Sequence, residues 1–121
     1  MIGYVTIGTN DLARHAKFYD AIAKELGGKR TMEAERYIGW GRDENSPSVL
    51  LIKPLDGKAA TAGNGSMTTF FATDRAMVDR VYKTALSLGG KDEGPPGERS
   101  PTFYAAYFRD LEGNKLAVFA G

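Results

Sequence analysis

The sequence predicts an α+β fold of two similar βαβββ-like modules, each with a small mixed sheet and one helix on its outer face. Short segments alternate apolar and polar residues, and two longer segments repeat apolar residues at helical spacing. The second half also repeats the first: Asp74 lies 63 residues after Asp11, and residues 88–91 copy residues 26–29. We expect one domain over residues 1–121, with modules of about 1–56 and 64–121, because this length suits a single core.

The first module begins with a strand over residues 2–8, where Val5 and Ile7 point one way and Tyr4 and Thr6 the other. Asn10 and Asp11 offer an N-cap, and Gly27 with Gly28 ends the helix that follows. Its apolar face comprises Leu12, His15, Ala16, Tyr19, Ile22, Ala23 and Leu26. Strands are expected near residues 29–34, 36–41 and 48–53, with a polar turn over 42–47.

A Gly- and Ala-rich segment, residues 54–65, links to the second module. A strand over 67–72 precedes Asp74, and the next helix places Val78, Val81, Tyr82, Ala85 and Leu88 on one face. Residues 93–101 are rich in turn formers, so we expect a loop there, including the string Gly94 to Arg99. Strands over 103–109 and 115–119 then form a hairpin through a turn at Glu112, Gly113 and Asn114.

Composition excludes several classes of function. Lys and Arg number 16 and Asp and Glu 15, with no run of five like charges, so neither nucleic acid nor a membrane surface is an expected partner. The absence of cysteine excludes a disulfide framework, a thiolate nucleophile and sulfur-based zinc sites. The N-terminus has no basic region before an apolar stretch, and no apolar run approaches the ~20 residues of a membrane span. We expect a cytoplasmic protein.

Three stretches resemble one family, the glyoxalase, bleomycin resistance protein and dioxygenase superfamily, also called vicinal oxygen chelate proteins. They are YVTIGTNDLARHAKFYD at the start, MTTFFATDRAMVDRVYKTALSLGG in the middle and YFRDLEGNKLAVF at the end. The resemblance implies two βαβββ modules whose sheets form a half-open barrel around a cleft, with the helices outside. It also implies a homodimer and a divalent metal in the cleft.

The positions that resemble the family's metal ligands do not hold metal-binding residues. Those positions, a His on each module's first strand and a Glu on the last strand, fall on Tyr4, Met67 and Ala117. Alanine has no donor atom, a thioether is soft, and a neutral phenol has a pKa near 10. The strand that supplies a fourth carboxylate in some members offers only Leu50, Leu51, Ile52 and Lys53. We therefore expect a member of the family without metal or other cofactor.

Strand alternation and the resemblance together predict which side chains face the cleft. The predicted ligand-binding residues are Tyr4, Thr6, Trp40, Met67, Thr69, Phe71, Tyr107, Arg109 and Ala117. Tyr107 resembles a cleft tyrosine of fosfomycin-modifying members; its hydroxyl either donates to a ligand or fills the space that a metal leaves. Trp40 either stacks on a planar ligand or lies at a dimer contact. His15, the only histidine, is expected to be partly buried at the helix surface, away from the cleft.

These residues support three hypotheses. The first is a protein that binds a small aromatic or amphipathic molecule in the cleft. The second is a metal-independent enzyme of lyase, isomerase or transferase type that uses Tyr4, Tyr107 or Arg109 for proton transfer or oxyanion stabilisation. The third is a dimeric interaction module with a vestigial cleft. The lack of a strong base among the predicted cleft residues favours binding over catalysis.

The residue types at the three ligand positions generate a first prediction. We expect the purified protein to bind no divalent metal specifically, because Tyr4, Met67 and Ala117 replace nitrogen and oxygen donors. Metal analysis after dialysis checks this expectation. Stoichiometric nickel, zinc, manganese or iron that is lost when these positions are altered would contradict it.

Overall fold

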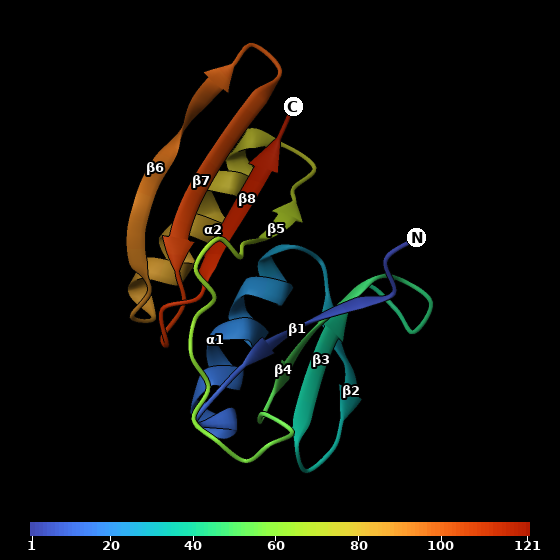
Figure 1. The fold of residues 1–121 in the computed structure, drawn as a ribbon. Coiled ribbons are helices and arrows are strands. Elements are labelled where there is room, and N and C mark those ends of the chain that lie inside the picture. Colours follow the sequence, from blue (N-terminus) through green and yellow to red (C-terminus); the bar gives the residue numbers. More distant parts are fainter. The chain divides into compact units, whose positions relative to one another are not determined.

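The computed structural model describes all residues, 1–121, and the chain divides into two compact units (Figure 1). The first unit spans residues 1–61 and the second spans residues 62–121. Each unit contains one helix and one four-stranded sheet. The fold is thus α+β with two βαβββ modules, as the sequence predicts.

In the first unit, β1 (Tyr4–Gly8) leads into α1 (Leu12–Glu25), and β2 (Lys29–Glu33), β3 (Tyr37–Gly41) and β4 (Ser48–Ile52) follow. The strand order across the sheet is β1-β4-β3-β2. β1 pairs parallel to β4, while β4, β3 and β2 pair antiparallel in succession. The parallel neighbours β1 and β4 are separated along the chain by α1, β2 and β3, which provide the long connection that parallel strands need.

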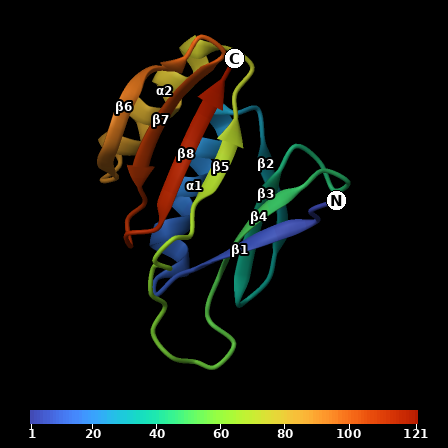
Figure 2. The same cartoon turned by 45° about the horizontal axis from the view of Figure 1, so that its top comes forward.

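The second unit repeats this topology with β5 (Thr68–Phe71), α2 (Arg75–Ser87), β6 (Lys91–Ser100), β7 (Phe103–Arg109) and β8 (Lys115–Ala120). The order is β5-β8-β7-β6, with β5 parallel to β8. In Figure 2, α2 lies behind β6, β7 and β8, so it covers a single face of this sheet. The opposite face, which we call the open face, has no helix of its own unit upon it.

Both helices begin with an aspartate N-cap and end with a glycine of positive φ. These shared caps explain the repeat in the sequence. Asp11 and Asp74 are the N-caps; their carboxylates accept from the backbone N–H groups of Arg14 (3.2 Å) and Met77 (2.8 Å). At the other end Gly27 and Gly89 adopt positive φ angles of 79° and 103°. The next residue in each case donates to a carbonyl of the last turn, as in a Schellman motif. Neither helix is long and apolar enough to cross a membrane.

Strand alternation decides which side chains enter each core. In the second sheet Phe108, Leu116 and Val118 are fully buried on the face that meets α2, where Val78 and Val81 pack. In the first sheet Ile7 and Leu51 take the corresponding places opposite α1. Burial of these side chains provides the main stabilising free energy, at about 25 cal/mol per Å² of apolar surface.

Two local expectations are wrong. Residues 91–100 form the edge strand β6, not a loop; register shifts at Gly94 and Gly97 let the strand pass Pro95 and Pro96, which make no ladder pair. Prolines are tolerated on such an edge because their missing N–H is not needed by a neighbour. His15 is fully buried, not at the helix surface, because its Nδ1 lies 3.1 Å from the Thr9 hydroxyl and its ring packs against Tyr19.

The two faces of the second sheet generate a stability prediction. Phe108→Ala should lower the free energy of unfolding by about 3–5 kcal/mol, because it leaves a cavity under α2. Phe71→Ala removes the same side chain from the open face, where Phe71 is 65% exposed, and should cost at most about 1 kcal/mol. Urea unfolding of both variants measures the difference. Equal destabilisation would mean that the two faces are assigned wrongly.

Candidate functional site

The open face of the second sheet brings together most of the predicted ligand-binding residues. In the register of β5, β8 and β7, Thr69 lies opposite Ala117, which lies opposite Tyr107. The next row along the strands joins Phe71, Phe119 and Ala105, and the row on the other side pairs Lys115 with Arg109. Met67, just before β5, is 46% exposed. These side chains share one face because residues two apart on a strand point the same way.

Tyr107 is the central side chain of this face. Its ring lies 5.5 Å from the guanidinium carbon of Arg99 and 5.6 Å from Nζ of Lys115, measured to the ring centroid. Both distances are within the range of cation–π attraction. The Tyr107 hydroxyl forms no hydrogen bond within the second unit. It is therefore a hydrogen-bond group available to a ligand.

Arg109 has partners for its charge. Its Nε donates to Glu93 (2.7 Å) and its Nη1 donates to the Gly113 carbonyl (3.1 Å). The side chains of Arg109 and Glu93 are 33% and 36% exposed, so this ion pair is only partly shielded from solvent. The negative charge of Glu93 offsets the positive charge of Arg109. Arg109 therefore attracts an anionic ligand less strongly than an arginine without an ion pair would.

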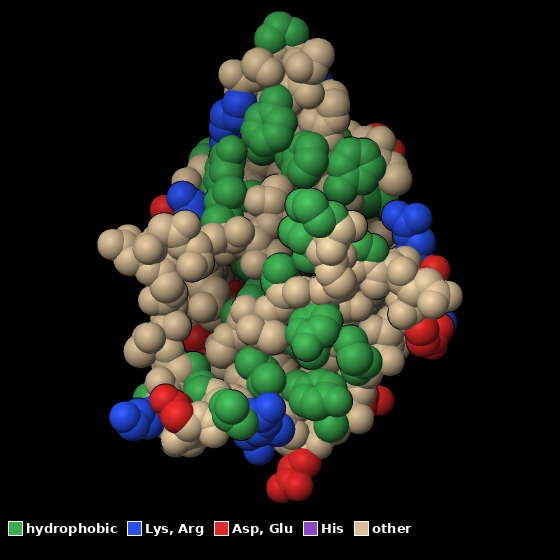
Figure 3. Space-filling model, turned by 45° about the vertical axis from the view of Figure 1, so that its right-hand side comes forward, with side chains coloured by type: hydrophobic (Ala, Val, Ile, Leu, Met, Phe, Trp, Pro, Cys, Tyr) green, Lys and Arg blue, Asp and Glu red, His purple; other side chains and the backbone are tan.

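An aromatic cluster occupies one end of the open face. The ring of Phe119 lies 5.5 Å from Phe71, edge to face, and 5.2 Å from Phe103, nearly parallel. Phe71 itself is 65% exposed. Figure 3 shows hydrophobic side chains gathered at the surface over the second unit. Phe103 and Phe119 are half-buried. An exposed ring such as Phe71 next to other aromatic rings is typical of a surface that contacts another molecule.

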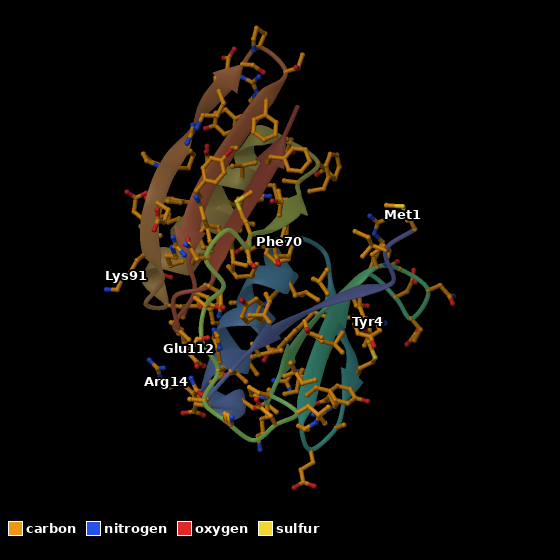
Figure 4. All side chains as sticks on the ribbon, in the orientation of Figure 1. Met1, Tyr4, Arg14, Phe70, Lys91 and Glu112 are labelled. Carbon is orange, nitrogen blue, oxygen red and sulfur yellow. The ribbon has the colours of Figure 1, made fainter.

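The first sheet presents Tyr4 and Thr6 on the face that α1 does not cover. Tyr4 lies at the start of β1 (Figure 4) and is 60% exposed. The centre of this face is filled by Leu50, whose side chain lies over Gly39; a Cβ built there would be 3.0 Å from Leu50 Cδ1. Apolar packing thus occupies the middle of this sheet, and the exposed polar groups are at its β1 edge.

Trp40 lies on the other face of the first sheet, against α1. Its indole Nε1 donates to Asp20 (2.8 Å), its ring packs 5.5 Å from Tyr19, and it is 3% exposed. Arg30 donates two hydrogen bonds to the same carboxylate, at 2.7 and 2.8 Å, and lowers the pKa of Asp20 below its usual value. Trp40 therefore belongs to the structural core, and we remove it from the residues expected to contact a ligand.

The three positions that resemble the family's metal ligands do not fit a divalent ion. Ala117 is 1% exposed and ends in a methyl group, Met67 offers only a thioether, and Tyr4 a phenol. No group of three or more His, Cys, Asp or Glu side chains is placed to hold a metal. We derive no chemistry through a metal at these residues.

The tyrosines with shifted pKa values lie away from the open face. Tyr104 points towards α2, where its hydroxyl donates to Asp79 (2.6 Å); this hydrogen bond raises its pKa because donation requires the protonated phenol. Burial and a similar bond to Asp92 raise the pKa of Tyr82. Each of these hydrogen bonds connects α2 to a strand. Neither tyrosine is therefore a candidate acid or base for a ligand on the open face.

Sequence reasoning missed two cationic residues beside Tyr107. Lys115 lies two residues before Ala117 on the same strand, so both side chains point to the same face. The alternation in the sequence could therefore have identified Lys115. Arg99 follows two register shifts in β6, so alternation cannot assign its face. Only the pairing of β6 with β7 brings Arg99 over Tyr107.

The chain matches one protein-family model and several solved structures. The family model described as "Glyoxalase/Bleomycin resistance protein/Dioxygenase superfamily" matches residues 1–118. A glyoxalase/bleomycin resistance protein from Albidiferax ferrireducens T118 is 32% identical, with 98% of this chain and 97% of that chain covered and a TM-score of 0.90.

More distant solved structures have the same fold. A putative glyoxalase from Bacillus halodurans is 19% identical over 100% of this chain and 96% of its own, with a TM-score of 0.81. A structure named lactoylglutathione lyase, from Agrobacterium tumefaciens, is 21% identical over 100% and 93%, with a TM-score of 0.70. No match is found among curated proteins.

Proposed function

Because the chain belongs to the glyoxalase, bleomycin resistance protein and dioxygenase superfamily, we propose that it binds a small aromatic or amphipathic molecule. The observation that supports this function most directly is the open face of the second sheet. There, the exposed ring of Phe71 and the half-buried ring of Phe119 lie one row from Tyr107, whose hydroxyl forms no hydrogen bond within the unit. Apolar surface with a few polar groups is the usual composition of a small-molecule site.

The ligand contacts that we propose lie on the open face of the second sheet. Phe71 and Met67 would contact the apolar part of the ligand, and Tyr107 would donate a hydrogen bond to it. Thr69, Arg109 and Ala117, on the same face, complete these contacts. Tyr4 and Thr6, on the first sheet, stay predictions from the sequence.

Binding is favoured over a metal-independent enzyme by the state of two groups, the imidazole of His15 and the guanidinium of Arg109. The chain's one imidazole, His15, is fully buried beside Thr9. Arg109, the candidate for oxyanion stabilisation, is already paired with Glu93 at 2.7 Å. A group that is buried or already paired is poorly placed to exchange a proton or stabilise new charge.

A neutral fluorescent probe tests the binding function. Prodan, a naphthalene ketone, should bind saturably with one site per chain, and Phe71→Ala should weaken binding because it removes exposed aromatic surface. Leu55→Ala is the matched control, since Leu55 is 88% exposed in the segment between β4 and β5. Binding that does not saturate, or that Phe71→Ala leaves unchanged, would contradict the proposal.

Tyr107→Phe provides a second test at the same site. The variant keeps the ring and removes one hydroxyl hydrogen bond to the probe's carbonyl, worth about 0.5–1.5 kcal/mol, so prodan affinity should fall about 2- to 10-fold. The circular dichroism spectrum and the midpoint of urea unfolding should not change, because the Tyr107 hydroxyl makes no hydrogen bond within the unit. Unchanged affinity would exclude Tyr107 as a donor to the ligand.

We further propose that the protein acts in the cytoplasm as a homodimer. The sheets end in unpaired edges at β1, β2, β5 and β6, and association of two chains is one way to cover such edges and exposed apolar side chains. Sedimentation equilibrium should give about twice the chain mass of 13.1 kDa at micromolar concentration. A single 13 kDa species would show that the chain is monomeric.

A further inference from the structure

Two cations on the open face of the second sheet lack carboxylate partners. Lys115 forms no ion pair, and its Nζ lies 5.6 Å from the centroid of the Tyr107 ring. Arg99 donates to two backbone carbonyls, those of Gly97 and Pro95, both at 2.8 Å. Carbonyls orient a guanidinium but do not neutralise it. By contrast, Arg75 and Arg109 form ion pairs with Glu98 and Glu93.

Arg99 is held in place by the unusual composition of β6. A Cβ at Gly97 would lie 2.8 Å from Arg99 Nη1, and a Cβ at Gly94 would lie 3.3 Å from Nη2. The Arg99 guanidinium therefore occupies space next to β6 that is free because Gly94 and Gly97 have no side chains. Arginine has five N–H donors, and two are used by the carbonyls, so three are left for a ligand.

The cations and the aromatic cluster lie at a spacing that suits one small molecule. Tyr107 and Ala117 form one row of the sheet, and Phe119 lies two residues farther along β8. Two residues of a strand span about 7 Å, which is close to the length of a fused aromatic ring system. A ligand whose apolar body lies over Phe119 and Phe71 would thus place its other end beside Tyr107, between Arg99 and Lys115.

We propose that this face selects amphipathic anions, small molecules with an aromatic or apolar body and one carboxylate, sulfonate or phosphate group. Arg99 and Lys115 hold the anionic group, the Tyr107 hydroxyl donates to it, and Phe71 and Phe119 contact the body. The inference rests on the proposed small-molecule function and adds the charge of the ligand. Opposite charges in a partly apolar site attract more strongly than in water, because fewer water molecules screen them.

A matched pair of probes tests the charge. Anilinonaphthalene sulfonate and N-phenylnaphthylamine share their ring system and differ in the sulfonate. The wild-type protein should bind the sulfonate more tightly, and added salt should reduce the difference. Lys115→Gln and Arg99→Gln should each weaken sulfonate binding about 2- to 5-fold, and the double variant about 10-fold, with neutral-probe binding within about twofold of wild type.

Two controls separate this site from general charge and general apolar binding. Lys83→Gln removes the same charge from an exposed position on α2, which covers the other face of the sheet, and should leave both probes unaffected. Phe71→Ala should weaken both probes alike, since both share the ring system. Far-ultraviolet circular dichroism confirms that each variant is folded.

The possible outcomes distinguish the two proposals. Equal binding of both probes, with no effect of the Lys115 and Arg99 variants, would overturn the anion selectivity and leave the small-molecule function standing. A loss with Lys83→Gln as large as with Lys115→Gln would show attraction by net charge alone and would also overturn it. Failure of both probes to bind would overturn the proposed function together with this inference.

Discussion

The register of the β7–β8 hairpin is the constraint on which the candidate site depends. Asp110 sets this register at the turn: one carboxylate oxygen accepts from the backbone N–H groups of Glu112 and Asn114, each at 2.9 Å. The Asn114 side-chain amide also donates to this carboxylate, and Gly113 supplies a positive φ of 89°. With the turn closed in this way, Tyr107 lies opposite Ala117. A slip of one residue would turn every side chain of one strand to the other face.

The two units share a topology but have different open faces. In the first unit Leu50 lies over Gly39 and fills the middle of the sheet with an aliphatic side chain. In the second unit the corresponding face holds aromatic rings, Tyr107 and two cations. Helix caps, helix ends and strand order agree between the units because they serve the fold. The side chains of the open faces differ between the units, so these faces are where the units can differ in function.

The open face of the second sheet carries two cationic side chains beside Tyr107 and no group of metal-binding side chains. Ala117 contributes a methyl group where a carboxylate would be required, and its neighbour across the strands is the Tyr107 ring. The charge beside the Tyr107 ring is positive and is supplied by Arg99 on β6 and Lys115 on β8. A metal ion also presents positive charge, but protein cations hold an anion through directional N–H donors and a smaller local charge.

The strands, helices and their faces were largely predictable from the sequence, because they depend on local rules. Alternation assigned Tyr4, Thr6, Thr69 and Phe71 to the faces that they occupy, and Asp11 and Asp74 marked the helix starts. The predicted hairpin of residues 103–109 and 115–119 is present, and it places Tyr107 opposite Ala117.

What only the tertiary structure decided depends on partners distant in the sequence. Trp40 joins the core because Asp20, on α1, accepts its indole N–H, and His15 is buried because Thr9 lies beside it. Residues 91–100 are a strand because β7 offers an edge to pair with, despite two prolines that predict a loop. Arg99 reaches Tyr107 only through the register shifts of that strand. Local patterns specify conformation, but which faces and side chains meet is settled by pairing and packing between elements.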